Sequence, residues 1–460
     1  MKKSIKMLSL AMSAVMLAGT MSGCGKKEAQ DSDVTVVTIW SGNSHSKEVM
    51  TKLYDEWNET EGKAQGIKIE YTVQGGDSLN NTIELALQNG TAPDILGGGD
   101  MGKMAENGDI LAWDDVPGGP ELIQKYKDDG VLTEGYGMYK GKTYQLPGGP
   151  GPQGMVYNKD MFKAAGIVDE KGEAKPPRTW KEVREYAKIL TDKSKDQYGI
   201  IAPMKWKGWF NSDISNPAMS LAGYTWYNPA TDKFDMAHWK TPMQTWLDMK
   251  ADGSIYPGAE SLDNDSARAM FAEGKIGMKF AFNFDVGVLN DQFPAKCDWG
   301  VCAYPVNEDG TTYKQRMDLG WGSYMNAHTK VPLDKLVIAM RALSDEKYQI
   351  ELFEKGIDMP YDTSIIEKAD TTNAKAGWVD FAKLADVSTL EPIAPKSDAA
   401  GLESSSDVFL NHVWTGEISV DEGIQRMQEN AEKSRENYYS VHPDENPAEF
   451  ADPNWKPAKQ

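Results

Sequence analysis

Short apolar segments alternate with amphipathic helical patterns along most of the chain. Eight segments rich in β-branched and aromatic residues predict strands, because turn-forming or polar residues bound each of them. They are residues 34–40, 67–73, 93–97, 143–147, 154–158, 198–203, 275–282 and 299–305. Since helical patterns lie between these segments, the alternation predicts an α/β fold with largely parallel sheets.

Three of the helical patterns carry a recognisable start. Ser46 is a plausible N-cap, whereas Thr179 with Glu182 and Ser419 with Glu422 match the capping-box pattern. The apolar positions that follow the first two starts are Val49, Leu53, Trp57, Val183, Tyr186, Ala187 and Leu190. We expect each of these segments to fold as a helix with one buried face.

The pattern breaks at residues 147–152, where every position is proline or glycine. Such a run is too rich in breakers for the interior of a helix or strand, and it indicates a crossover between two lobes. A helical block at 333–356 ends at Gly356, and the segment after it predicts another return between lobes. A length of 460 residues suits two or three domains, and the absence of a fixed repeat excludes solenoids.

Residues 1–23 have the pattern of an export signal: a positive start, an apolar segment and small residues before Cys24. This arrangement resembles the bacterial lipobox, in which the cysteine becomes the lipid-modified N-terminus. The alternative is a plain secretory signal with an incidental cysteine. Residues 24–33 are polar and without periodicity, as in a flexible tether.

The formal net charge of −20 argues against binding to nucleic acid, because such a surface repels phosphate backbones. Cys297 and Cys302 form either a local disulfide or two buried thiols. Only five histidines are present, none paired at helical spacing, so we expect no metal site and no cofactor.

Residues 97–100 read Gly-Gly-Gly-Asp directly after a predicted strand, which indicates that something needs close access to the backbone there. A phosphate site would require a lysine or arginine at the start of the next helix, and Asp100 stands in that place. No serine-hydrolase, zinc-protease or Cys–His pattern is visible in the chain. We therefore expect a neutral, hydroxyl-bearing ligand and no enzyme activity.

Aromatic residues next to glycine or asparagine are the other prominent feature. They occur in the segments 205–211, 222–228, 280–285 and 319–326. Each of them alone is as consistent with loop packing as with binding, but together they suit a carbohydrate cleft, in which rings stack on sugar faces and polar groups bind hydroxyls.

These motifs resemble those of the extracellular carbohydrate-binding lipoproteins of ABC importers, a maltose-binding-protein-like family of solute-binding proteins. The likeness runs through nearly the whole chain after the signal segment. It rests on six stretches: VTIWSGNSHSKEV, ALQNGTAPDILGGGDMGKMAENGDILAWDD, GKTYQLPGGPGPQGMVYNKDMFKAAGI, PPRTWKEVREYAKILT, MFAEGKIGMKFAFNFD and FLNHVWTGEISVDEGIQRMQE. The resemblance implies a two-lobed periplasmic-binding-protein-like α/β fold (type II), with three hinge crossovers near 143–148, 301–306 and 356–361. One lobe would hold residues 34–145 and 305–356, and the other would hold 146–304 and 357–460.

The resemblance also implies where the ligand binds. Asp100 corresponds to a ligand-loop aspartate, Trp209 to a stacking aromatic, and Trp321 to a platform on the other lobe. Asn283 and Phe284 fall where the family often has a Pro–Trp pair. The full set of implied ligand-binding residues is Asn43, Ser44, His45, Gln74, Asp100, Trp209, Trp226, Asn283, Phe284, Trp321, Trp378 and Glu403. Lys207 stands where the family often has an acid, so the specificity is expected to differ from that for maltose.

The expected function is capture of a carbohydrate, an oligosaccharide in particular, and its delivery to the permease subunits of an ABC importer. The protein would act as a monomer, lipid-anchored through Cys24 to the outer face of the cell membrane. The alternatives are a secreted glycoside-acting enzyme, and the same fold binding a peptide, a polyamine or another non-sugar solute.

Overall fold

The computed structural model describes residues 34–43, 46–74 and 78–460. The predicted signal segment, Cys24 and the tether lie outside the described residues, as do Ser44 and His45. None of the helices in the described ranges has an apolar stretch long enough to cross a membrane.

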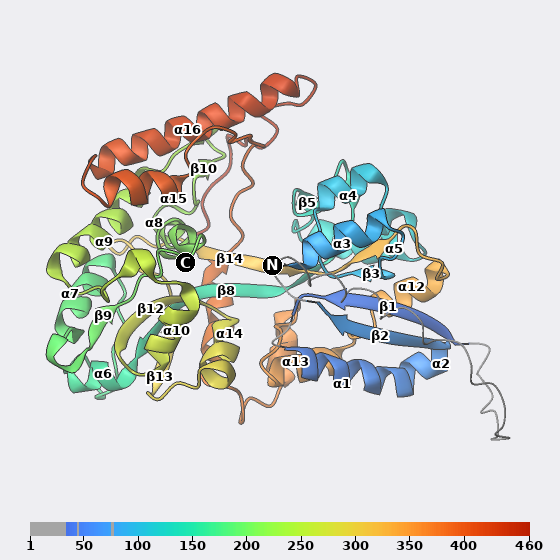
Figure 1. The fold of residues 1–460 in the computed structure, drawn as a ribbon, viewed down its shortest axis with the longest axis horizontal. Coiled ribbons are helices and arrows are strands. Elements are labelled where there is room, and N and C mark those ends of the chain that lie inside the picture. Colours follow the sequence, from blue (N-terminus) through green and yellow to red (C-terminus); the bar gives the residue numbers. More distant parts are fainter. Residues whose placement is uncertain (1–33, 44–45, 75–77) are drawn as a thin grey trace, which may run out of the picture.

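The first lobe is built on a five-stranded sheet in the order β2-β1-β3-β15-β4. Its strands are β1 (Thr35–Ser41), β2 (Ile67–Val73), β3 (Ile95–Leu96), β4 (Ile110–Leu111) and β15 (Tyr324–Asn326). β1 pairs in parallel with β2 and β3, whereas β15 pairs antiparallel with β3 and β4. The helices around this sheet are α1 (Lys47–Trp57), α2 (Lys63–Gln65), α3 (Leu79–Gln88), α4 (Met101–Asn107), α5 (Gly119–Asp128), α12 (Leu333–Met340) and α13 (Glu346–Glu354) (Figure 1).

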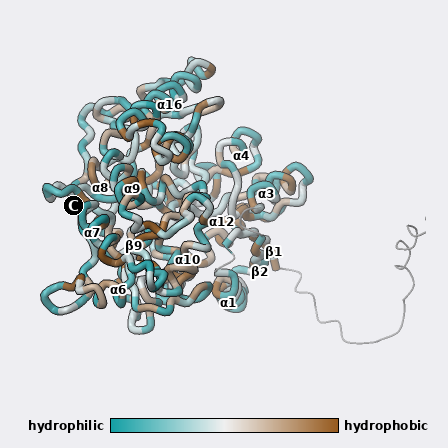
Figure 2. Tube along the Cα trace, turned by 60° about the vertical axis from the view of Figure 1, so that its left-hand side comes forward, coloured by the Kyte–Doolittle hydropathy of each residue, from teal (hydrophilic) through white to brown (hydrophobic). Residues whose placement is uncertain are grey.

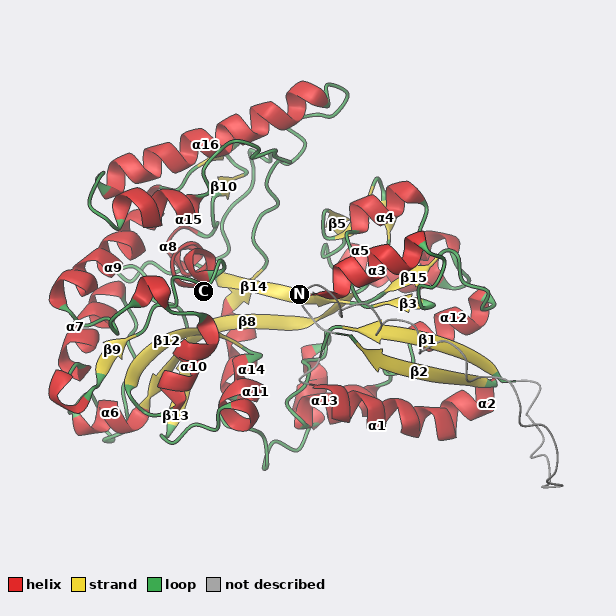
Figure 3. Ribbon diagram, viewed as in Figure 1, coloured by secondary structure: helices red, strands yellow, loops and turns green. Residues whose placement is uncertain are grey.

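The second lobe is built on a sheet in the order β16-β14-β8-β12-β9, with β13 also paired to β8. These strands are β8 (Pro147–Asn158), β9 (Tyr198–Ile200), β12 (Ile276–Phe282), β13 (Trp299–Cys302), β14 (Gln315–Trp321) and β16 (Ser388–Thr389). Its helices are α6 (Lys159–Ala164), α7 (Trp180–Leu190), α8 (Asn216–Ala222), α9 (Lys240–Asp252), α10 (Asn264–Ala272), α11 (Asp285–Gly287), α14 (Trp378–Leu384), α15 (Ser405–Val408) and α16 (Val420–Val441). The last of these extends from the second lobe over the top of the molecule (Figure 3).

Two small sheets complete the topology. One joins β5 (Thr133–Glu134), β6 (Gly137–Tyr139) and β7 (Lys142–Thr143), and the other is the hairpin of β10 (Tyr227–Asn228) and β11 (Lys233–Phe234). The predicted strand at 143–147 is wrong in its central part. Residues 144–146, which lie between β7 and β8, form no strand.

The crossover predicted at 147–152 is present, but it is not a loop. These six residues form the first half of β8, which runs between the lobes and pairs antiparallel with β14 (Figure 1). A Cβ atom on Gly149 would lie 1.5 Å from the carbonyl oxygen of Met359, so the segment after α13 crosses directly against β8. The expectation that this run could not lie inside an element is therefore wrong, because close packing of crossing backbones requires glycine there.

The second crossing lies later in the chain than the predicted 301–306. β13 pairs with Met155–Asn158 of β8, inside the second-lobe sheet, and β14 is the strand that runs beside the crossing half of β8. The second sheet is also mixed rather than largely parallel, since β8 is antiparallel to β12, β13 and β14. The residue boundaries of the lobes remain a prediction.

Of the three predicted helix starts, one has the full expected cap and a second has half of it. Ser419 and Glu422 form a complete capping box at α16. Thr179 accepts a hydrogen bond from the backbone N–H of Glu182 at α7, but the Glu182 carboxylate accepts from Arg178 and not from Thr179. At α1, Ser46 makes no cap bond and donates instead to the carbonyl of Asn43.

Each lobe has its own hydrophobic cores. Trp57 and Trp113 are buried in the first lobe, and Trp180, Trp209 and Trp246 are buried in the second. The outer turns of α1 and α16 are largely hydrophilic, which leaves the hydrophobic segments inside (Figure 2). Helices whose apolar faces cover a sheet account for this arrangement.

Cys297 and Cys302 are both free thiols, which decides between the two possibilities left open by the sequence. Burial raises the pKa of Cys302 to about 12 and that of Cys297 to about 11, so neither forms a thiolate readily. No cluster of His, Cys, Asp and Glu that could hold a metal ion occurs among the described residues.

Candidate ligand-binding site

The first lobe offers polar groups at one edge of its sheet. β1, β2 and β3 are parallel and in register, so the residues that follow them meet at the carboxyl edge, where open α/β sheets bind ligands. Asn43, Gln74 and Asp100 follow these three strands, and the backbone N–H of Gln74 donates to the carbonyl of Ser41 at 2.8 Å. The structure therefore brings these three predicted residues to one edge.

The glycine run before Asp100 serves the chain itself. A Cβ atom on Gly97 would lie 2.3 Å from the carbonyl oxygen of Trp40, and Gly99 adopts a φ of +122°. Both positions require glycine in the absence of any ligand. The backbone contact at Gly97 and the positive φ at Gly99 therefore explain these glycines without the close approach of a ligand.

Asp100 is the N-cap of α4. Its Oδ1 accepts a hydrogen bond from the backbone N–H of Lys103 at 2.9 Å, and the residue is exposed. A capping carboxylate is held in a fixed orientation at the positive end of the helix. Asp100 is therefore a preorganised acceptor at the edge of the first lobe.

The second lobe presents an aromatic surface at the end of β12. Phe282 and Phe284 stack in parallel, with ring centroids 5.1 Å apart and an interplanar angle of 6°. Trp206 meets Phe282 edge-to-face at 6.3 Å. Phe284 is 48% exposed, which is unusual for a phenylalanine and leaves a ring face open to a ligand. We call Trp206, Phe282 and Phe284 the aromatic surface.

A buried ion pair holds this surface in place. Asp285 is 2% exposed; one of its oxygens accepts from the backbone N–H of Phe282 at 3.0 Å, and the other lies 2.6 Å from Nε of Arg268. The Arg268 guanidinium lies 5.7 Å from the centroid of the Phe284 ring. Because β12 runs antiparallel to β8, its carboxyl end faces back towards the crossover strands. Asn283, the second predicted residue at this place beside Phe284, donates its backbone N–H to the carbonyl of Pro152.

Trp209 and Trp378 do not belong to this surface. Each is 1% exposed: Trp209 packs against Trp246 and Phe409, and Trp378 packs against Phe353. The stacking role predicted for Trp209 and the looser assignment of Trp378 are therefore corrected to core packing. Trp206, three residues earlier, is the aromatic that reaches the surface.

Two further predicted residues are engaged elsewhere. Trp226 is half-buried against Phe234 of the β10–β11 hairpin. Glu403 accepts from Arg426 on α16 and lies 3.1 Å from Nε2 of His412. These contacts give both residues structural roles in the second lobe.

Trp321 is half-buried at the end of β14, where the strand enters the first lobe. Its ring lies 6.2 Å from that of Tyr136, at an angle of 42°. Burial, followed by the charge of Glu391, raises the pKa of Tyr136 to about 12, so its hydroxyl stays protonated and able to donate. Tyr136 and Trp321 form an aromatic pair beside the crossover.

A hydrogen-bonded network lies on the crossover strands. Gln153 of β8 donates to Asp318 of β14 at 2.7 Å, and Arg316 contacts Asp318 at 2.7 Å and Glu391 at 3.2 Å. Arg316 also donates to Asn216 on α8 at 2.7 Å. Asp318 is 51% exposed while being held by two partners, which makes it a second fixed acceptor.

Five residues near the proposed site were not predicted from the sequence: Trp206, Tyr136, Arg316, Asp318 and Glu391. A signal existed for Arg316 and Asp318, because charged residues at i and i+2 of an apolar strand share one face and must be paired or exposed. Glu391 lies far along the chain, and nothing local connects it to them.

Comparison with known proteins identifies the family. Residues 41–332, more than half of the chain, match the bacterial extracellular solute-binding protein family. A maltotriose-binding protein of Pyrococcus abyssi is 26% identical over 61% of this chain and 56% of its own. The sn-glycerol-3-phosphate-binding periplasmic protein UgpB of Brucella melitensis is 24% identical over 73% of this chain and 76% of its own. A putative binding protein of Brucella abortus matches at 26% over only 39% of its length.

Solved structures support the same fold. The GacH receptor of Streptomyces glaucescens superposes with a TM-score of 0.63 at 19% identity, over 89% of this chain and 99% of its own. The MalE maltose/maltodextrin-binding domain of Bdellovibrio bacteriovorus gives 0.61 at 19% identity, over 87% and 99%. The two-lobed fold predicted from the sequence is confirmed, and the chain belongs to the family of bacterial extracellular solute-binding proteins.

Proposed function

We propose that this protein captures a carbohydrate between its two lobes and delivers it unaltered to the permease subunits of an ABC importer. The observation that carries the proposal is the parallel pair of Phe282 and Phe284, with Phe284 48% exposed. Sugar rings have apolar C–H faces that gain by lying on exposed aromatic rings.

Polar groups on both lobes complete the proposed site. Asp100 and Asp318 are carboxylates held by other contacts, and Asn43 and Gln74 lie at the same sheet edge as Asp100. Hydroxyl groups of a sugar can donate to these fixed oxygens without any reorganisation of the protein. Closure of the lobes around the crossover strands would then remove the sugar from water.

The pairing of the nearby arginines favours an uncharged ligand. Arg268 contacts Asp265 and Asp285, and Arg316 contacts Asp318 and Glu391. A phosphorylated ligand, such as the one in the name of the Brucella melitensis relative, would need a cation that is not already neutralised. Binding of a phosphorylated solute is the weaker alternative for that reason.

Titration calorimetry with a panel of oligosaccharides tests the proposal, with the sugar recovered afterwards and analysed by chromatography. We expect stoichiometric binding and intact sugar. Phe284→Ala should weaken binding by about 1–2 kcal/mol, because an exposed stacking face is lost. Ile189→Ala, which removes an exposed side chain on α7 outside the proposed site, should leave binding unchanged.

Turnover of the sugar would instead support the alternative of a secreted glycoside-acting enzyme. Absence of binding to every sugar tested would overturn the carbohydrate assignment.

Trp209→Ala is expected to lower the free energy of unfolding by about 3–5 kcal/mol, as for other buried aromatic residues, and not to affect ligand binding selectively.

We further propose that Cys24 carries a lipid that anchors the protein to the outer face of the cell membrane, and that the protein acts there as a monomer. The lipobox-like residues before Cys24 and the polar segment after it support this arrangement. A two-chain lipid would give durable attachment, whereas one chain would not.

A further inference from the structure

We infer that the groove between α3 and α4 continues the ligand site, so that the protein binds a saccharide chain long enough to leave the cleft and run over the first lobe. The inference rests on the proposed function and specifies its ligand: an oligosaccharide rather than a single sugar. We call this groove, lined by residues of 80–88 and 99–109, the α3–α4 groove.

The α3–α4 groove starts at the proposed site. Asp100 and Gly99 lie at its beginning, where the backbone N–H of Gly99 donates to Asn80 at 2.9 Å. The cavity has a volume of about 640 Å³, within the range of pockets that bind small molecules. From Asn80 to Gln88, α3 rises about 12 Å along the groove wall, away from the sheet edge.

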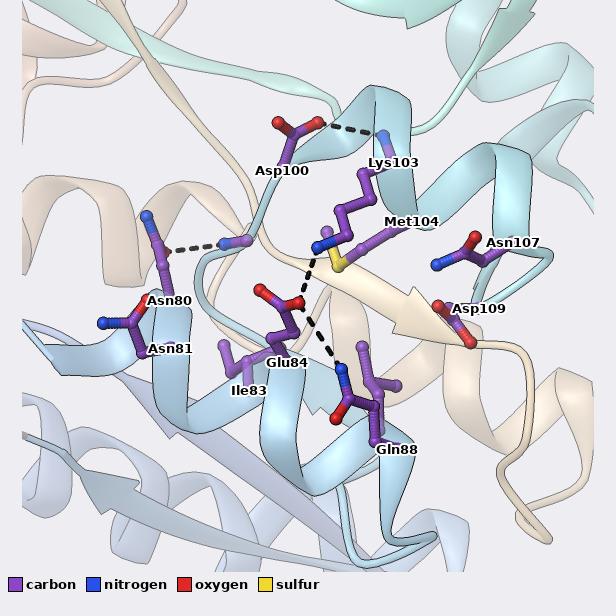
Figure 4. Close-up of a pocket in the computed structure, with 12 residues that line it drawn as sticks. Asn80, Asn81, Ile83, Glu84, Gln88, Asp100, Lys103, Met104, Asn107 and Asp109 are labelled. Carbon is purple, nitrogen blue, oxygen red and sulfur yellow. Dashed lines mark hydrogen bonds and ion pairs between the residues drawn. The ribbon is translucent and has the colours of Figure 1, made fainter.

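The side chains of the groove suit a hydroxyl-rich ligand. Figure 4 shows amide groups along the α3 wall and that of Asn107 at the end of α4, with the side chains of Ile83 and Met104 between the two helices. The amide residues are Asn80, Asn81, Gln88 and Asn107. Each amide has both donors and an acceptor, which matches hydroxyls that also donate and accept. The apolar floor can meet the C–H edges of sugar rings.

An ion pair bridges the middle of the groove. Lys103 Nζ on α4 lies 2.5 Å from Glu84 Oε1 on α3, and Gln88 donates to the same carboxylate at 3.4 Å. The two charged side chains are 55% and 46% exposed. An ion pair this exposed contributes little to stability, so a sugar hydroxyl can insert between the charges or replace one of them.

Continuity with Asp100 favours a saccharide over a protein partner. Asp100 caps the helix that forms one wall of the groove and is also the acceptor proposed for the sugar in the cleft. A chain bound at Asp100 therefore meets Asn80 and Lys103 next. A peptide segment of the permease would have no such link to the bound sugar.

The test measures affinity against chain length. The full-length receptor is titrated with maltooligosaccharides, xylooligosaccharides and chitooligosaccharides of two to seven units. In the series that binds, we expect affinity to rise with each ring beyond those held in the cleft. Glu84→Gln and Lys103→Gln should each weaken the longest chain about tenfold, the effect of losing one hydrogen bond to a charged group, and leave the shortest bound chain unchanged.

Two further variants make the result specific. Glu70→Gln breaks the Lys68–Glu70 ion pair on β2, which is equally exposed at 55% and 54% and lies outside the groove, so no chain length should be affected. Asn107→Trp places a bulky ring at the far end of the groove and should reduce only the binding of the longest chains. Thermal unfolding of all variants checks that they are folded.

The outcomes separate the inference from the proposed function. If a sugar series binds but its affinity stops rising with length, or the groove variants bind all lengths like the parent, the inference is wrong and the proposed function stands. Groove variants that bind every sugar normally but fail to stimulate a reconstituted permease would assign the groove to a protein partner and overturn the inference. If no series binds, both are overturned.

Discussion

Two histidines of the second lobe have opposite surroundings. His238 lies with Nε2 2.9 Å from the carbonyl oxygen of Thr225 and packs its ring edge-to-face on Tyr224, and burial lowers its pKa to about 4. His412 lies between the carboxylates of Glu417 and Glu403, at 2.9 and 3.1 Å, and hydrogen bonds to them raise its pKa. The two side chains should therefore affect stability in opposite directions as the pH changes.

We predict that His238→Gln stabilises the protein relative to the parent as the pH is lowered from 7.5 to 4.5. Below the ordinary pKa of 6.5 the unfolded chain binds a proton that folded His238 does not, so the parent loses stability down to about pH 4, by at most about 3 kcal/mol. Urea unfolding at both pH values measures the difference.

His412→Gln serves as the opposite control. Its raised pKa means that the parent has a stabilising contribution below pH 6.5, which is lost as the pH rises through the folded value. This variant should lose stability relative to the parent at pH 4.5. Equal pH dependence of both variants and the parent would contradict the assignment of these surroundings.

Residue types alone did not decide which aromatics are exposed and which are buried in the core. Trp209 and Trp206 lie three residues apart in one glycine-containing loop, yet one is in the core and the other on the aromatic surface. Their orientation depends on where Phe409 and Phe282 pack, residues distant in sequence. Phe284 was named from its place in a motif shared with the family, and the structure leaves its side chain 48% exposed. Its contact with a ligand remains a prediction.

At the scale of elements, β8 is the strand that joins the lobes. Its proline- and glycine-rich half pairs with β14, and its apolar half pairs with β12 and β13. Composition correctly indicated a crossover but wrongly indicated a loop, because the pairing that keeps Pro150 and Pro152 extended comes from a strand some 165 residues away.

Gly149→Ala should destabilise the protein by about 1–3 kcal/mol, the range for overpacking, because its Cβ would lie 1.5 Å from the Met359 carbonyl oxygen and force two crossing segments apart. Thermal and urea unfolding measure this loss. Gly151→Ala is the matched control in the same strand: its Cβ would lie 3.5 Å from the nearest atom, so we expect a change within about 0.5 kcal/mol. Similar effects of both changes would show that the crossing is not tightly packed.

At the scale of the whole molecule, the alternation of strands and helices and the family motifs were sufficient to predict two α/β lobes. The position of the second crossing and the charged network around Arg316 were not predictable, because they depend on pairing between segments far apart in the chain. Local pattern therefore identified the lobes, and tertiary pairing determined how they are joined.

The proposed attachment to the membrane concerns the whole molecule and can be tested directly. Cys24→Ser should move the protein from the membrane fraction to the culture medium, because the proposed lipid cannot be added. Fractionation and immunoblotting measure the shift, and mass spectrometry of the parent should find a lipid on Cys24. Sugar affinity should be the same in both forms. Absence of a lipid on Cys24 of the parent would contradict lipid anchoring.

The pairing of β14 with β8 restricts how the lobes can move. A ladder of backbone hydrogen bonds resists sliding within the plane of the two strands, whereas bending across that plane leaves the ladder intact. The pair should therefore bend perpendicular to the plane of the two strands. We expect the bending to concentrate at the register shift between Leu319 and Trp321. The lobes would then open and close by rotation in a single direction. The ligand would therefore enter and leave the cleft from the same side in every cycle.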